Sequence, residues 1–173
     1  MIPYITQANP EGLYLLDLDI TLDRIQTAGK FIKKFDIKKV IVYSGRAYAT
    51  TPIEKFRELT GAEKMLGRFM PGTLTNPSLS YFSEPHLIVI SDPQVDAQAI
   101  TEATNAGIPV IGIANTDNVT SKLDLVIPAN NRGRKALATV YWLLAREILQ
   151  DSETMKYKIE DFETKTVEVE EEL

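Results

Sequence analysis

Short apolar runs rich in branched residues recur along the chain and alternate with segments of helical periodicity. Five of these runs predict β-strands, at residues 13–16, 40–43, 87–90, 109–113 and 123–127. The runs are apolar throughout rather than at every second position, which is typical of strands buried on both faces. The pattern therefore predicts a three-layer α/β domain, in which helices cover both faces of a mostly parallel five-stranded sheet.

Apolar residues at three- and four-residue steps predict the first helix. Its apolar face consists of Leu22, Ile25, Ala28, Ile32 and Phe35. Thr51 and Glu54 have the spacing of a capping box, which predicts the start of a second helix with Pro52 at its first position. Gly61 is predicted to end that helix.

End signals also place two further helices. Asp92 is predicted to be the N-cap of the third, with Pro93 at its first position and Gly107 at its end. Asn130 or Asn131 is predicted to cap the last helix. The apolar side of this last helix consists of Leu137, Val140, Tyr141, Leu144 and Ile148.

Charge is distributed unevenly along the 173 residues, whose net charge is −5. Residues 151–173 alone carry a net −6, so we expect one folded domain at 1–150 and a flexible acidic tail after it. Residues 30–68 hold ten bases and four acids, and this local excess keeps nucleic-acid binding open despite the acidic total. The chain has no cysteine, no membrane-length apolar run and no basic signal-like start, which favours a cytoplasmic location.

Polar residues follow four of the predicted strands, at 44–46, 91–93, 115–118 and 130–134. Ligands bind at the carboxyl ends of parallel strands, and helix starts there favour anions. Arg132, Arg134 and Lys135 oppose the dipole of the last helix, which makes them candidate phosphate contacts. The sequence contains no glycine-rich dinucleotide motif and no phosphate-binding loop, so no cofactor is predicted.

Candidate catalytic and metal-binding residues are few. His86 is the only histidine and precedes a strand, at the edge of the sheet away from the usual ligand site. Asp17, Asp19 and Asp23 lie close enough in sequence to suggest a metal site, but Asp is also favoured in turns and helix starts. We predict the second role, and neither a catalytic group nor a metal.

The segment at residues 67–77, GRFMPGTLTNP, has neither helical nor strand periodicity. Its Gly and Pro residues punctuate the backbone, its Thr and Asn residues bring short hydrogen-bonding groups, and Arg68 is suited to a phosphate. From these residues alone it is either a slack surface loop or a loop shaped to hold a ligand.

Several long segments resemble the archaeal ribosomal protein S2 family and its eukaryotic SA, or laminin-receptor-like, relatives. The resemblance covers residues 11–150 and is carried, in order, by GLYLLDLDITLDRIQTAGKFI, VIVYSGRAYATTPIEKFRELTGA, GRFMPGTLTNP, HLIVISDPQVDAQAITEATNAGIPVIGIANTDN, LDLVIPANNRGRKAL and YWLLAREIL. It implies a flavodoxin-like (Rossmann-like) fold and a structural, non-enzymatic role in the small ribosomal subunit. The implied partners are small-subunit ribosomal RNA and neighbouring ribosomal proteins.

Family members differ from this sequence in three respects. They have some tens of residues before the segment that resembles YITQANPEGLYLLD, including a His-Ile-Gly motif, and this N-terminal arm is absent from the printed sequence. Bacterial members have a coiled-coil insertion, and no heptad stretch of that kind occurs here, which favours the archaeal branch. At His86 a carboxylate is more usual.

RNA binding in such a protein is expected to depend on shape and on phosphate contacts from Arg and Lys. The expected RNA-binding residues are Arg46, Arg57, Lys64, Arg68, Thr73, Thr75, Asn76, Arg132, Arg134 and Lys135. Because the loops after two of the strands share an edge, Arg46 and Arg132 are expected to converge. Thr73, Thr75 and Asn76 either contact RNA or only hold the loop. Lys30, Lys33 and Lys34 are weaker candidates on an outer helix face.

Two other functional classes fit parts of the sequence. Residues 110–128 resemble phosphosugar-binding or isomerase-like domains, which need a Glu or His base that is not evident at the carboxyl edge. A receiver-like signalling domain needs an acidic cluster, which Asp17 and Asp19 could begin, and a Lys after the fifth strand that is not found close by. Binding to small-subunit RNA distinguishes the ribosomal role from both.

Overall fold

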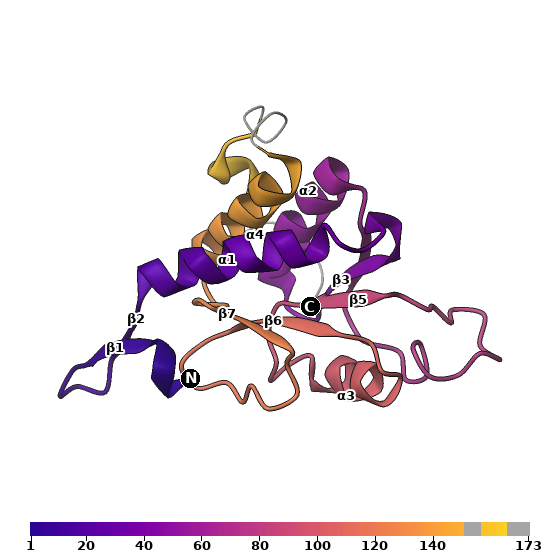
Figure 1. The fold of residues 1–173 in the computed structure, drawn as a ribbon, viewed down its shortest axis with the longest axis horizontal. Coiled ribbons are helices and arrows are strands. Elements are labelled where there is room, and N and C mark those ends of the chain that lie inside the picture. Colours follow the sequence, from indigo (N-terminus) through magenta and orange to yellow (C-terminus); the bar gives the residue numbers. More distant parts are fainter. Residues whose placement is uncertain (151–156, 166–173) are drawn as a thin grey trace.

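The computed structural model describes residues 1–150 and 157–165. Its main sheet has five parallel strands in the order β4-β3-β5-β6-β7, and helices cover both faces (Figure 1). The strands are β3 (Val40–Ser44), β4 (Glu63–Leu66), β5 (Leu87–Ile90), β6 (Val110–Ala114) and β7 (Leu125–Pro128). This confirms the predicted three-layer, flavodoxin-like α/β architecture.

The central strands are buried on both faces because their side chains alternate between two apolar cores. Val40 and Val42 point into the core shared with α1 (Leu18–Ile32), α2 (Thr50–Thr60) and α4 (Arg134–Leu149). Ile41 and Tyr43 point into the second core, under α3 (Ala97–Asn105). The continuous apolar runs seen in the sequence therefore reflect two covered faces, as expected for a parallel sheet.

The prediction of a buried strand at residues 13–16 is wrong. β2 (Tyr14–Leu16) pairs antiparallel with β1 (Ile5–Ala8) in a separate two-stranded sheet, which projects from the main body in Figure 1. Tyr14 is 52% exposed. The fifth place in the main sheet belongs instead to β4, an edge strand whose polar sequence hid it from a search for apolar runs.

Helix α1 begins at Leu18, and the Asp17 carboxylate accepts hydrogen bonds from the backbone N–H groups of Asp19 (2.9 Å) and Ile20 (3.3 Å). The helix-start role predicted for Asp17 is thus confirmed. Leu22 departs from the predicted buried face, since 45% of it is exposed.

The predicted capping box at the start of α2 is also wrong. The short 3₁₀ helix η3 (Ala47–Ala49) runs directly into α2, so the chain is already helical before Thr51. Ala49 occupies the N-cap without a side-chain hydrogen bond, and the Glu54 carboxylate pairs with Lys64 instead. The other end agrees with the sequence, because Gly61 closes α2 with a φ of 80°.

Part of the acidic C-terminal region, to which the sequence assigned no structure, packs on the domain. The 3₁₀ helix η5 (Ile159–Phe162) places the Phe162 side chain in the core beside α2 and α4, where it is fully buried. The Trp142 indole N–H donates to the Tyr157 carbonyl (2.9 Å), and the Thr164 hydroxyl donates to the Tyr48 carbonyl (2.9 Å). For residues 157–165 the expectation of an unstructured tail is therefore wrong; residues 151–156 and 166–173 lie outside the described part.

The described residues also form two other 3₁₀ helices, η1 (Ile2–Tyr4) and η2 (Ile37–Lys39). Within the described residues, no helix combines the length and apolar character needed to cross a bilayer.

Replacing Phe162 with Ala should lower the free energy of unfolding by about 3–4 kcal/mol, because it empties a fully buried aromatic position. Urea unfolding followed by circular dichroism measures the change. Ile159→Ala on the same 3₁₀ helix is the control, since Ile159 is 38% exposed and its truncation should cost less than 1 kcal/mol. Equal effects of the two changes would contradict the packing of Phe162 in the core.

Candidate nucleic-acid interface

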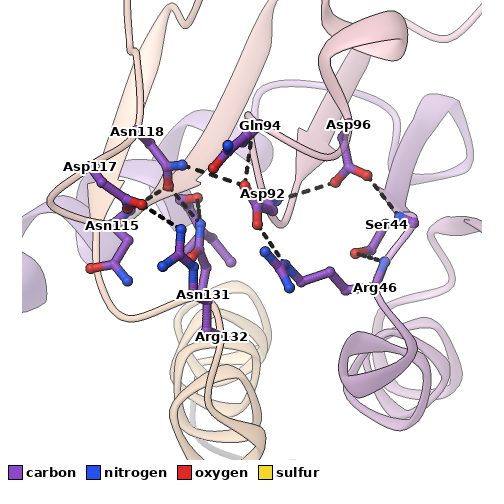
Figure 2. Close-up of polar contacts among 12 residues, drawn as sticks. Ser44, Arg46, Asp92, Gln94, Asp96, Asn115, Asp117, Asn118, Asn131 and Arg132 are labelled. Atoms are coloured by element: carbon purple, nitrogen blue, oxygen red, sulfur yellow. Dashed lines mark hydrogen bonds and ion pairs between the residues drawn. The ribbon is translucent and has the colours of Figure 1, made fainter. Parts of the chain in front are cut away.

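The four polar segments expected at the carboxyl ends of the strands do meet at one edge of the sheet. They follow β3, β5, β6 and β7, and Figure 2 shows residues from all four within a single hydrogen-bonded network. Arg46 and Arg132 both lie at this edge, as the sequence predicted (Figure 2).

Asp92 is the buried acceptor of this network. It is 0% exposed, and its Oδ2 accepts a hydrogen bond from Arg46 Nε at 2.5 Å. Its Oδ1 accepts from the Gln94 backbone N–H (2.9 Å) and, at a longer 3.5 Å, from Asn118 Nδ2. The prediction of Asp92 as a helix N-cap is wrong, because α3 begins only at Ala97 and Asp92 closes the turn before it.

The asparagines after β6 and β7 hold their two loops together rather than capping a helix. Asn118 Oδ1 accepts from the Asn115 backbone N–H (2.7 Å) and from Asn131 Nδ2 (2.9 Å), which also donates to the Ile113 carbonyl (3.0 Å). The N-cap of α4 is Gly133 without a side-chain hydrogen bond, so neither Asn130 nor Asn131 caps this helix.

Asp96 connects the loops that follow β3 and β5. Its two carboxylate oxygens accept from the backbone N–H groups of Gly45 (2.8 Å) and Asp92 (3.2 Å). Burial raises the pKa of Asp96 to about 7, although these hydrogen bonds act in the opposite direction. No pattern in the sequence had pointed to Asp96.

The loop at residues 67–77 is shaped by a buried carboxylate that the sequence analysis missed. Glu102, on α3, accepts from the backbone N–H groups of Gly72 (2.8 Å) and Leu74 (3.3 Å), and more weakly from the Thr75 hydroxyl (3.5 Å). Burial pushes the pKa of Glu102 upward, but these hydrogen bonds, with one from Gln98, bring the pKa below its ordinary value. A signal existed, because Glu102 interrupts an otherwise apolar helix face.

The polar side chains of this loop are used within it. Thr73 is buried, and its hydroxyl donates to the Met70 carbonyl (2.5 Å). The Asn76 side chain accepts from the Ser78 backbone N–H (3.1 Å), while Thr75 is the hydroxyl that reaches Glu102. These hydrogen bonds hold the loop, while contact of Thr73, Thr75 or Asn76 with RNA stays a prediction.

Two of the expected basic residues line the same cavity. Arg46, from the loop after β3, and Arg68, from the loop after β4, border a space of about 510 Å³. Gly45, Phe69 and Asp96 form other parts of its wall.

The remaining basic residues are distributed over separate positions. Lys64 pairs with Glu54 (2.5 Å), and exposed Arg132 pairs with Asp117. The Arg57 side chain is exposed on α2, and Arg134 is partly buried in the first turn of α4. Exposed Lys135 borders an apolar groove of about 880 Å³ between α1, β2 and α4.

Residues near the amino ends of the strands do not join this edge. Lys30, Lys33 and Lys34 are exposed at or just after the end of α1, which precedes β3. His86 is exposed before β5, as expected, and its backbone N–H donates to the Lys39 carbonyl (2.8 Å). Within residues 1–150 and 157–165, no group of three or more His, Cys, Asp or Glu side chains has an arrangement that could hold a metal ion.

Replacing Glu102 with Ala should destabilise the protein by about 2 kcal/mol, because the N–H groups of Gly72 and Leu74 lose their acceptor. Urea unfolding measures the loss. Glu84→Ala is the control, since Glu84 is an exposed carboxylate in the β4–β5 connection that also contains Gly72 and Leu74. A loss below about 0.5 kcal/mol for Glu102→Ala would mean that the loop does not depend on this carboxylate.

Asp96 should make stability depend on pH. Because its pKa is raised on folding, the folded state binds a proton that the unfolded state has released, and stability falls as pH rises from about 4 to about 7. The slope due to this group approaches about 1.4 kcal/mol per pH unit within that window. Urea unfolding of the wild type and of Asp96→Asn at successive pH values should show a shallower decline in the variant. Parallel curves would contradict the assignment.

Comparison with known proteins places these features in a family. A family model described as Ribosomal protein S2 matches residues 78–151. Proteins named small ribosomal subunit protein uS2 match almost the whole chain: that of Nitrosopumilus maritimus is 68% identical and that of Cenarchaeum symbiosum 57% identical. The alignments cover 98% and 96% of this chain and 85% and 83% of the relatives. The chain therefore belongs to the ribosomal protein S2 family.

Proposed function

We propose that this protein is a structural constituent of the small ribosomal subunit, where it binds ribosomal RNA and neighbouring ribosomal proteins. The observation that carries the proposal is the 68% identity, over 98% of the chain, to a protein named for that subunit. The role places the protein on ribosomes in the cytoplasm and requires no catalytic group. It supports subunit assembly and translation through binding alone.

The proposed RNA contacts are the basic side chains that reach the surface near the carboxyl edge and along α2. Arg57 and Arg68 are exposed, and Arg132 and Lys135 are exposed at the start of α4. Phosphates attract such side chains whatever the base sequence, and the A-form geometry of ribosomal RNA favours this kind of contact. Arg46 also belongs to this set, although its Nε is held by Asp92.

Surface ion pairs do not remove Lys64 and Arg132 from the proposed interface. Both pairs are partly exposed, and exposed pairs contribute at most about 1 kcal/mol. A phosphate can therefore replace Glu54 or Asp117 as the partner at little cost. The partly buried Arg134 is a further proposed contact, whereas Thr73, Thr75 and Asn76 contribute by fixing the loop that presents Arg68.

A tagged copy of the full chain should sediment with small subunits and whole ribosomes in sucrose gradients at moderate salt. The double variant Arg57→Ala/Arg132→Ala should leave the small subunit at lower salt than the wild type. Each lost phosphate contact reduces the slope of log affinity against log salt by about 1. Lys38→Ala is the control, because Lys38 is exposed in η2 at the opposite edge of the sheet.

Gradient position at low and high salt gives the result directly. A wild-type chain that remains at the top of the gradient, free of RNA at moderate salt, would overturn the proposed function and revive the phosphosugar-binding alternative. Loss of the double variant and of Lys38→Ala at the same salt concentration would show that the assigned residues are not the contacts.

A further inference from the structure

The cavity bordered by Arg46 and Arg68 lies at the point where the order of the strands in the sheet reverses. From β3 the chain passes through α2 to the edge strand β4, and then returns to β5 on the other side of β3. The loop after β3 therefore leads to a helix on one face, and the loop after β5 leads to α3 on the other (Figure 1). In open parallel sheets, the crevice between two such loops is the usual position of a ligand.

This crevice has the size of a small-ligand site. Its volume of about 510 Å³ falls within the range of about 300–1,000 Å³ that is typical of such pockets. Its apolar wall includes Phe69, packed edge-on against the Tyr43 ring at 5.3 Å between centroids, and Val95, which is 48% exposed. A flat aromatic ligand would find an apolar surface here beside two cationic side chains.

Arg46 is held in place for anion binding. The Arg46 Nε–H group donates to Asp92, and this contact fixes the guanidinium. The two terminal nitrogens of the guanidinium are further hydrogen-bond donors suited to a phosphate. Arg68 approaches from the loop after β4, which Glu102 and Thr73 keep in one conformation. The helical stretch formed by η3 and α2 also begins at this crevice without a side-chain cap.

Among the residues that the structure describes, Asp96 is the one carboxylate that borders the crevice, and it would repel an anion if it were free. Both of its oxygens accept backbone N–H groups, and its pKa of about 7 means that it holds a proton for a large part of the time near neutrality. The repulsion is therefore reduced. The Asp92 carboxylate offsets the charge of Arg46, so exposed Arg68 supplies the main positive charge of the crevice.

We propose that this crevice binds one phosphate-bearing nucleotide, with the phosphate between Arg46 and Arg68 and the base against Phe69 and Val95. The nucleotide comes either from ribosomal RNA, as an unstacked residue, or from solution, as a free mononucleotide. The first source rests on the proposed function, and the second does not.

Two measurements on the full-length chain test this site. In the first, the ¹⁵N-labelled protein is titrated with AMP, UMP and inorganic phosphate while the amide signals of Gly45, Gly67 and Gln98 are followed. In the second, a photo-crosslinking amino acid replaces Val95, and the protein is irradiated within small subunits isolated from cells. Val119 is the matched control position, because it is an exposed valine, at 76%, outside the crevice.

A crosslink from position 95, but not from position 119, to one ribosomal nucleotide supports the RNA source. Amide shifts caused by AMP or UMP support a free nucleotide as the ligand. The affinity obtained from them should fall about tenfold or more in Arg68→Ala and stay unchanged in Lys38→Ala. Arg68 is exposed, so its variant should fold. Shifts no larger than those caused by inorganic phosphate, together with no specific crosslink, would overturn the site.

Sedimentation of the crosslinker variant distinguishes failure of the site from failure of the proposed function. If the variant travels with small subunits while both binding tests are negative, the ribosomal role stands and the nucleotide site is rejected. If the variant and the wild type both remain free of subunits, the ribosomal role fails. The titration alone then decides whether the crevice binds a nucleotide.

Discussion

The buried carboxylate of Asp92 ties together three of the loops at the carboxyl edge of the sheet. A carboxylate with no exposed surface is tolerated only when it is paired and hydrogen-bonded, so its partners are constrained in turn. Arg46 comes from the loop after β3, and Asn118 comes from the loop after β6. Asn118 then reaches Asn131 in the loop after β7. The relative positions of the surface residues at this edge follow from this interior chain of contacts.

Sequence patterns predicted the parts of the fold in which local and tertiary forces agree. The strands at residues 40–43, 87–90 and 109–113 are buried on both faces, and their apolar runs record that burial directly. The pattern misplaced one strand because the apolar residues at 13–16 lie exposed on a separate hairpin. It missed β4 because an edge strand keeps polar side chains that a central strand would lose.

The candidate site was predicted in outline but not in its internal bonding. The rule that ligands bind at strand carboxyl ends located the correct edge. The predicted caps at Asp92 and Asn131 were wrong because α3 begins only at Ala97 and α4 has Gly133 at its N-cap. Both side chains also bind partners far away in sequence, Arg46 and the Ile113 carbonyl respectively. The ion pair between Arg132 and Asp117 was not predicted either, because local sequence patterns carry no information on contacts between separate loops. Glu102 was the one organising residue with a readable local signal.

The position of Phe162 has a consequence for the order in which the protein is completed during synthesis. Residues 1–150 include every strand of the main sheet and the helices on both faces, but the core beside α2 and α4 is filled by a side chain that comes later in the chain. Domains form as the chain emerges, N-terminal segments first. While α4 has left the ribosomal tunnel and η5 is still inside it, the core of the nascent chain therefore lacks the Phe162 side chain. The last packing step awaits the emergence of residues 157–165 from the tunnel.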